Sequence, residues 1–257
     1  MLERLQRWRD TRRLRNSRIP WSLWQAAVRA VPVLKRLPPR YRWRLRALAG
    51  RFLQGKTISG ARGLVPDDFS RVFIAAQACL PVLRLGLDWY RGWTEVIVYP
   101  DTFVVERDEY DAGGVVHRTR RALAGESWDR GPVILSWADV HPPQGHRHPG
   151  SNVVLHEFAH KLDLLNGSAN GMPPLHSGMS HRAWTETFSE AYAQLCRQLE
   201  RGQHPPLDPY AGEGPAEFFA VASEEFFEDP VHLQRAYPAV YGQLAGFYRQ
   251  DPLAWSG

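Results

Sequence analysis

Two histidines and a glutamate stand at a spacing that suits metal-assisted hydrolysis. His156, Glu157 and His160 form the pattern H-E-x-x-H. Residues four apart on a helix lie on one face, so the imidazoles of His156 and His160 can bind one Zn²⁺ at about 2.0–2.1 Å. Glu157 is turned by about 100° around the helix and stays near the metal, where it can take a proton from a metal-activated water. The pattern therefore predicts a hydrolytic zinc site.

A helix must position this motif, and the surrounding sequence predicts one over residues 151–165. Ser151 or Asn152 can cap its start, and Asn166-Gly167 can end it in a left-handed turn. The alternative is a pair of ordinary core histidines beside a salt-bridged glutamate, but burying three such groups without a purpose is costly. The apolar positions at helical spacing are Val153, Val154, Leu155, Phe158, Leu162 and Leu165.

A catalytic zinc site needs a third protein ligand and an open fourth position. No histidine follows His160 closely, and His176 and His181 fall in or beside a loop. A carboxylate from a later helix is therefore preferred, but spacing alone does not choose among the candidates. Glu217 and Glu224 lie seven residues apart on one helix face, so one can bind metal while the other supports a histidine. The candidates are Glu186, Glu190, Glu217, Glu224 and Glu225.

The elements that position these residues follow the order helices, strands, helices, which is typical of an α+β fold. We expect a small, mostly antiparallel sheet. Gly55 to Gly63 resembles a linker, so we divide the chain into a basic helical extension over 1–60 and a catalytic domain over 61–257. The N-terminal residues expected to anchor short, proline-broken helices are Trp8, Trp21, Trp24 and Trp43. Predicted strands cover 95–99, 102–105, 115–117 and 132–137, a polar loop covers 141–150, and predicted helices cover 69–85, 151–165, 181–201, 215–228 and 231–248.

Charge is distributed unevenly along the 257 residues. Residues 1–51 hold 15 of the 32 Lys/Arg and 2 of the 27 Asp/Glu, a net charge of +13, and the remainder carries −8. Such a segment can bind nucleic acid or an anionic membrane. A solvated helix face packed on an acidic domain is the preferred interpretation, so neither partner is expected.

Cysteine usage and hydropathy favour the cytoplasm. Cys79 and Cys196 are too few for a disulfide framework, and we expect buried small side chains rather than a thiol nucleophile. No uncharged apolar run is long enough to span a membrane, and no secretory signal is visible.

Six segments, in chain order, carry a family resemblance: Cys79–Leu83, Glu95–Pro100, Gly131–Trp137, Asn152–Asp163, Asp208–Ala211 and Pro215–Ala220. They resemble the Mlc titration factor A family of bacterial zinc peptidases, over about residues 51–252. The catalytic domain of that family is similar to anthrax lethal factor, which implies a zincin-like fold and one Zn²⁺ per chain. By position, the resemblance makes Glu217 the third zinc ligand and Tyr210 a hydroxyl donor to the tetrahedral intermediate. Without the resemblance, Tyr210 would be a loop aromatic packed beside Pro209.

The resemblance has three further implications. The family's best-known member binds the repressor Mlc, so a similar transcriptional repressor is a candidate partner. Val221 stands four residues after Glu217, where thermolysin-like enzymes carry an aspartate, so a carboxylate that supports a histidine must come from elsewhere, with Glu224 and Asp163 as candidates. The strand over 132–137 precedes the motif helix and is expected to be the edge strand that pairs with an extended substrate.

The sequence therefore predicts a cytoplasmic zinc metallopeptidase of the gluzincin type, acting on a peptide or protein, with aminopeptidase action as one option. His156, His160 and Glu217 bind Zn²⁺, Glu157 is the general base, and Tyr210 stabilises the oxyanion. The rival hypothesis is a regulator-binding protein that sequesters a repressor, with peptidase activity secondary. An arginine-rich nucleic-acid binder ranks last.

Overall fold

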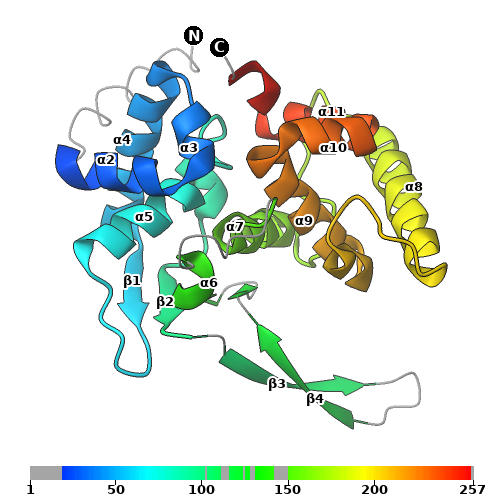
Figure 1. The fold of residues 1–257 in the computed structure, drawn as a ribbon, viewed down its shortest axis with the longest axis horizontal. Coiled ribbons are helices and arrows are strands. Elements are labelled where there is room, and N and C mark those ends of the chain that lie inside the picture. The colour runs from blue at the N-terminus through cyan, green and yellow to red at the C-terminus, as the bar shows by residue number, and fades with distance from the viewer. Residues whose placement is uncertain are drawn as a thin grey trace.

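The computed structural model describes residues 19–101, 103–110, 116–123, 125–127, 131–141 and 150–255. Trp8, the start of the basic segment and most of the predicted loop over 141–150 lie outside these residues. The N-terminal helices lie on one side of helix α7 (Val153–Asp163), and the C-terminal helices lie on the other (Figure 1). Within the described ranges, no helix has both the length and the hydropathy that crossing a bilayer requires.

Three N-terminal helices follow the predicted proline breaks: α2 (Trp21–Ala30), α3 (Pro32–Arg36) and α4 (Pro39–Gly55). Pro32 and Pro39 begin their helices, where the missing N–H has no intrahelical partner to lose. The expectation that their tryptophans anchor the core is right for Trp24, which is 2% exposed. It is wrong for Trp21 and Trp43, which are 58% and 49% exposed. Trp21 instead lies under a guanidinium, with Arg46 Cζ 5.2 Å from its ring centroid.

The sheet corrects the predicted strand directions. Its order is β1 (Thr57–Gly60), β2 (Glu95–Tyr99), β6 (Val133–Ser136) and β5 (Gly125–Ser127). The pairs β1–β2 and β2–β6 are parallel, and β5 is antiparallel to β6. The mostly antiparallel sheet was therefore a wrong expectation. Helix α5 (Asp68–Ala78) lies between β1 and β2 in the chain and serves as the crossover that parallel strands need.

Two further corrections concern the sheet edges. The predicted linker over 55–63 contains β1, an outer strand whose Ile58 is 5% exposed. The strand over 132–137 is not an edge strand, because β6 pairs with β2 on one side and β5 on the other. The short strand β5 is the outer strand beside α7.

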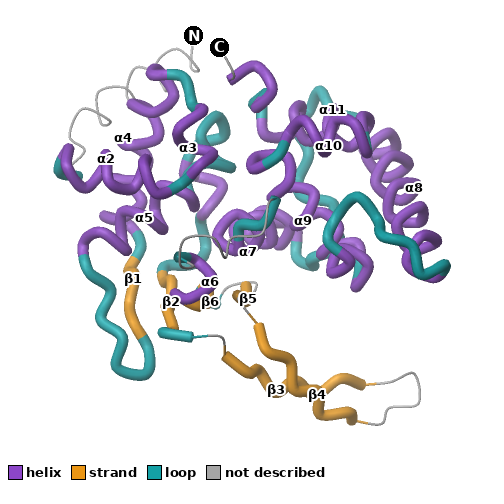
Figure 2. The backbone as a smooth tube through the Cα atoms, in the orientation of Figure 1, coloured by secondary structure: helices purple, strands orange, loops and turns teal. Residues whose placement is uncertain are grey.

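A separate two-stranded hairpin is formed by β3 (Phe103–Tyr110) and β4 (Val116–Leu123). Its strands are antiparallel, with Phe103 opposite Leu123 and Tyr110 opposite Val116. Both are longer than the strands predicted there, and the hairpin extends away from the other elements (Figure 2).

The helices predicted after residue 68 are present, with two main changes of boundary. The helix expected over 231–248 is divided in two because Pro238 begins a new helix, and the one expected over 69–85 ends at Ala78. The remaining elements are α6 (Trp137–Val140), α8 (His181–Glu200), α9 (Pro215–Glu228), α10 (Pro230–Ala236), α11 (Pro238–Tyr248) and the 3₁₀ turns η1 (Leu87–Tyr90), η2 (Leu164–Asn166), η3 (Pro209–Glu213) and η4 (Pro252–Trp255).

Helix α7 lies in the middle of one hydrophobic core that includes residues on both sides of the predicted boundary at residue 60. Its Phe158 is fully buried against Phe52 of α4, Tyr90 and Trp93, with ring centroids 5.8, 5.2 and 5.7 Å away. Full burial of such a ring contributes about 1.5–3 kcal/mol. The helices before residue 60 therefore pack on the rest of the molecule, and the division into two domains stays a prediction about sequence organisation.

The loop after α7 is held by a glycine that allows a close backbone approach. Gly171 has φ +76°, and a Cβ there would lie 2.5 Å from the Pro215 carbonyl oxygen. Its N–H donates to Asp163 Oδ2 at 2.7 Å. We expect Gly171→Ala to lower the free energy of unfolding by about 1–3 kcal/mol, measured by urea denaturation. Gly178→Ala in the same loop is the control, because its Cβ meets no atom within 4 Å. Equal stability of the two variants would contradict this account.

Candidate metal centre

Helix α7 presents its two histidines together at the predicted spacing. The helix begins after Asn152, whose Oδ1 accepts a hydrogen bond from the Leu155 N–H at 3.1 Å. The rings of His156 and His160 have centroids 4.7 Å apart, and their Nε2 atoms are 3.1 Å apart. The two side chains are 8% and 9% exposed. The predicted cap and the predicted pairing of the histidines are both present.

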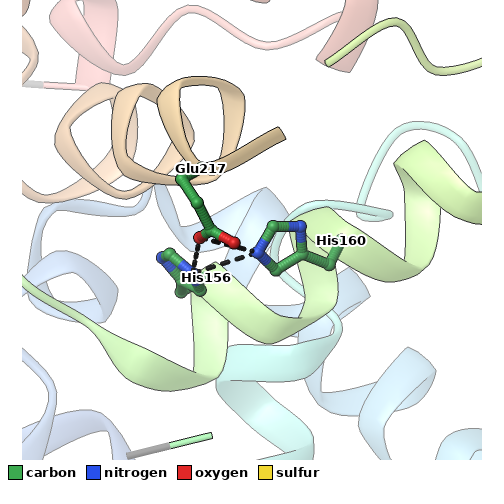
Figure 3. A group of neighbouring side chains, drawn as sticks. All are labelled: His156, His160 and Glu217. Carbon is green, nitrogen blue, oxygen red and sulfur yellow. Dashed lines mark hydrogen bonds and ion pairs between the residues drawn. The ribbon is translucent and has the colours of Figure 1, made fainter. Parts of the chain in front are cut away.

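The third member comes from the first turn of α9. Glu217 Oε2 lies 3.1 Å from His156 Nε2 and 3.2 Å from His160 Nε2 (Figure 3). Pro215 begins α9 and Glu217 is in its first turn, so the carboxylate lies at the positive end of the helix dipole. Among the residues that the structure describes, these three form the one group of His, Cys, Asp or Glu able to hold a metal ion.

The other candidate glutamates, among which sequence spacing could not choose, lie outside this group. Glu186 pairs with Arg182 at 2.7 Å on the exposed side of α8, and Glu190 is exposed on the same helix. The Glu225 carboxylate forms a hydrogen bond with His232 Nδ1. The more distant histidines are also elsewhere: His176 Nε2 lies 2.8 Å from the Phe247 carbonyl oxygen and His181 is exposed.

Glu224 supports His156 from the side opposite the cluster. Its Oε1 lies 2.7 Å from His156 Nδ1, and its Oε2 accepts the Asn152 backbone N–H at 2.5 Å. In the neutral ring with its proton on Nδ1, that proton is donated to Glu224 and the Nε2 lone pair faces Glu217 and His160, which is the tautomer that metal binding through Nε2 requires. Asp163, the other predicted support, instead accepts from Gly171 and holds the loop after the helix.

The charges of the cluster favour a cation. Burial alone would raise the pKa of Glu217, but hydrogen bonds with His156 and His160 outweigh it and keep this pKa well below its ordinary value. Burial would lower the pKa of His156, but Glu224 and Glu217 raise it well above its ordinary value. The two shifts together show that the surrounding carboxylates stabilise positive charge at this place, whether a proton or a metal ion carries it.

The donor set also fits a tetrahedral metal. Ligand atoms at about 2.0–2.1 Å from a tetrahedral ion are separated by about 3.3 Å. The three atoms of the cluster are 3.1, 3.1 and 3.2 Å apart. Two imidazole nitrogens and one carboxylate oxygen are ligands typical of a zinc site that retains an open position.

Glu157 is buried next to this group. It is 4% exposed, and its Oε2 makes no hydrogen bond with any residue that the structure describes. Burial raises its pKa to about 7, while His156 and His160 act in the opposite direction. A carboxylate with this pKa can both accept and release a proton near neutral pH.

Tyr210 lies beside the cluster rather than in it. It belongs to η3, where its backbone N–H donates to Asp208 Oδ1 at 2.9 Å. Its ring centroid is 5.9 Å from that of His156, and the residue is 39% exposed. The ring thus lies next to His156 and is partly open to solvent.

Comparison with known proteins decides the family. The sequence profile described as "Glucose-regulated metallo-peptidase M90" matches residues 5–249. The chain belongs to this metallopeptidase family. The match begins at residue 5, so the N-terminal helices lie within the M90 region, whereas the resemblance was expected to begin near residue 51.

Individual relatives of this M90 chain confirm the predicted resemblance. Mlc titration factor A of Escherichia fergusonii is 37% identical over 248 residues, which are 96% of this chain and 91% of the relative. The protein of the same name in Salmonella arizonae is 39% identical over 235 residues, 90% and 91% of the two chains. An uncharacterized protein of Synechocystis sp. is 39% identical over 232 residues, 90% and 84% of the two chains.

Two residues that contribute to the surroundings of the three-residue cluster were not predicted to do so from the sequence. Asn152 was considered as a helix cap, but it also contacts Glu224. Gln77 is 1% exposed, and its Oε1 accepts from Asn152 Nδ2 at 2.9 Å. The available signal was a glutamine inside the strongly apolar stretch of α5, since a buried amide requires partners.

Proposed function

We propose that this chain is a zinc-dependent peptidase in which His156, His160 and Glu217 bind the metal. The observation that carries the proposal is the convergence of two Nε2 atoms and one carboxylate oxygen from α7 and α9, at 3.1–3.2 Å from one another. Membership of a metallopeptidase family supports the same chemistry. We place the protein in the reducing cytoplasm, where its free Cys79 and Cys196 would remain thiols.

In this proposal Glu157 moves the proton. When bound, Zn²⁺ supplies a Lewis acid that polarises a peptide carbonyl and lowers the pKa of water toward about 7. Glu157 Oε2 accepts the proton of the attacking water and then passes it to the leaving amine. Its burial keeps bulk water from competing for that proton.

The substrate is an extended peptide in this proposal. Among the described strands, β5 is the outer strand of the sheet next to α7, so its outer edge can pair with a substrate main chain. Main-chain pairing would recognise a peptide backbone with little regard for sequence.

The test is cleavage of a mixed peptide library by the purified chain, with and without a zinc chelator. We expect cleavage that the chelator stops and added Zn²⁺ restores. Peptides with free and acetylated N-termini distinguish aminopeptidase from endopeptidase action, because an aminopeptidase requires the free amine. Cleavage that persists at full rate in metal-free protein would contradict the proposal.

Tyr210 is proposed to donate its hydroxyl hydrogen to the developing oxyanion. Such a bond forms mainly in the transition state, so its loss lowers kcat more than it raises KM. We expect Tyr210→Phe, which keeps the ring beside His156, to lower kcat by about 10–1,000-fold without changing zinc affinity. Steady-state kinetics on a cleaved library peptide give both constants. Unchanged kinetics would leave Tyr210 with a packing role alone.

A second candidate function is capture of a transcriptional repressor, with cleavage secondary. It is favoured by the name Mlc titration factor A that several relatives carry. Glu157→Ala separates the two, because it keeps all three metal-binding side chains and removes the base. If the effect of the chain on the repressor's target genes persists in Glu157→Ala, capture is favoured. If that effect is lost, cleavage is favoured.

A further inference from the structure

Three helices meet at one buried asparagine. Asn152, which is 5% exposed, directly precedes α7. Its Nδ2 donates to Gln77 Oε1 of α5 at 2.9 Å and to Glu228 Oε1 of α9 at 2.6 Å. Its Oδ1 accepts from Leu155, and its backbone N–H donates to Glu224 Oε2. One side chain thus joins the start of the histidine helix to two other helices.

The surrounding hydrogen bonds permit one orientation of this amide. Gln77 Nε2 donates to the Phe73 carbonyl at 3.1 Å, which leaves Gln77 Oε1 as an acceptor. Asn152 Oδ1 is occupied by the Leu155 N–H, so the amino group must face Gln77 and Glu228. Both amino hydrogens are then used, and the network is complete at Asn152.

We propose that Asn152 is a positioning residue for the metal site, which fixes α7 against α9 and thereby sets the separation of the ligand atoms. The inference rests on the proposed function, because it assumes that His156, His160 and Glu217 bind zinc. The histidines come from α7 and Glu217 comes from α9. Asn152 reaches α9 twice, through Glu228 and through Glu224, the residue that also holds His156 Nδ1. Ligands must be held within about 0.5 Å of their productive geometry, and partners outside the ligands are what hold them.

The alternative role for Asn152 is that of a helix cap alone. Serine is as good a cap as asparagine, but it has no amino group to reach α5 or α9. Aspartate keeps the shape and the capping oxygen, and it replaces both donors with an acceptor that faces Gln77 Oε1 and Glu228. Asn152→Ser and Asn152→Asp therefore retain the cap and the backbone hydrogen bond to Glu224, and they remove the side-chain hydrogen bonds to Gln77 and Glu228. The matched control is Ser180→Ala, which removes the cap of α8, a helix that carries no ligand.

The experiment measures zinc affinity of each variant by competition with a chromophoric chelator, beside the thermal stability of each metal-free protein. We expect both Asn152 variants to bind Zn²⁺ about 10-fold more weakly than wild type, at the lower end of the effect of losing a supporting partner. Ser180→Ala should bind as wild type does, although it is also destabilised. The visible spectrum of bound Co²⁺ should shift in the Asn152 variants and not in Ser180→Ala, because that spectrum reports the ligand geometry.

Gln77→Met provides an independent check, since Gln77 contacts none of the proposed ligands in the interactions described above. It should weaken zinc binding in the wild-type background and have little further effect when combined with Asn152→Ser. A folded Asn152→Ser protein with wild-type affinity and spectrum would overturn the inference. So would affinity losses that merely follow stability, with Ser180→Ala affected equally. If Asn152→Asp does not fold, the Asn152→Ser variant alone provides the test. A wild-type chain that binds no zinc would refute the proposed function itself, and this inference with it.

Discussion

Replacing Glu157 by glutamine is expected to lower the rate of peptide cleavage by at least about 100-fold, the usual contribution of a positioned general base. Glutamine has the shape of glutamate but cannot accept the proton of the attacking water. The side chain is 4% exposed and lies next to His156, so no solvent base can take its place without rearrangement. The loss should appear in kcat, measured with a peptide that the wild type cleaves.

The same variant must keep its metal and its fold for this result to identify the base. Zinc content should equal that of the wild type, because Glu157 is not one of the three clustered groups. Its melting temperature should not fall, since an amide is less costly to bury than a carboxylate. Glu190→Gln is a control of the same chemistry on the exposed face of α8, and it should be fully active. Near wild-type turnover of Glu157→Gln would rule out Glu157 as the base.

Removal of Glu217 is expected to have the largest effect on metal binding. Glu217→Ala deletes one of three proposed ligands. Loss of a residue that only supports a ligand lowers metal affinity by about 10–100-fold, and we expect Glu217→Ala to lower zinc affinity by more than that. Glu224→Ala should fall within that range, because Glu224 reaches the site through His156 Nδ1 at 2.7 Å. Chelator competition on both variants gives the two dissociation constants. A smaller loss for Glu217→Ala than for Glu224→Ala would assign their roles the other way round.

The metal helix could be predicted from the sequence because its signals are local. The apolar spacing around Phe158 and the capping ability of Asn152 act within a few residues, and α7 indeed begins after Asn152. The third member of the cluster could not be chosen in this way. Glu217 and Glu224 face the same side of α9, and only the packing of α9 on α7 places one at Nε2 and the other at Nδ1 of His156. The family resemblance resolved this choice where spacing did not.

The sheet shows the opposite case, in which local signals are insufficient. The alternating residues of β2 and β6 predict strands, but strand direction depends on the connection between them. The glycine-rich stretch over 55–63 resembled a linker because glycine favours loops, yet Ile58 is buried there and Thr57–Gly60 pairs with β2. Tertiary contacts thus overrode a compositional signal.

The most direct test of the account is the zinc content and zinc X-ray absorption spectrum of the purified chain. We expect about one Zn²⁺ per chain, bound by two imidazole nitrogens and carboxylate oxygen, and the loss of that ion in His160→Ala. A chain that takes up no zinc, or whose zinc remains with the same spectrum after His160→Ala, would contradict it.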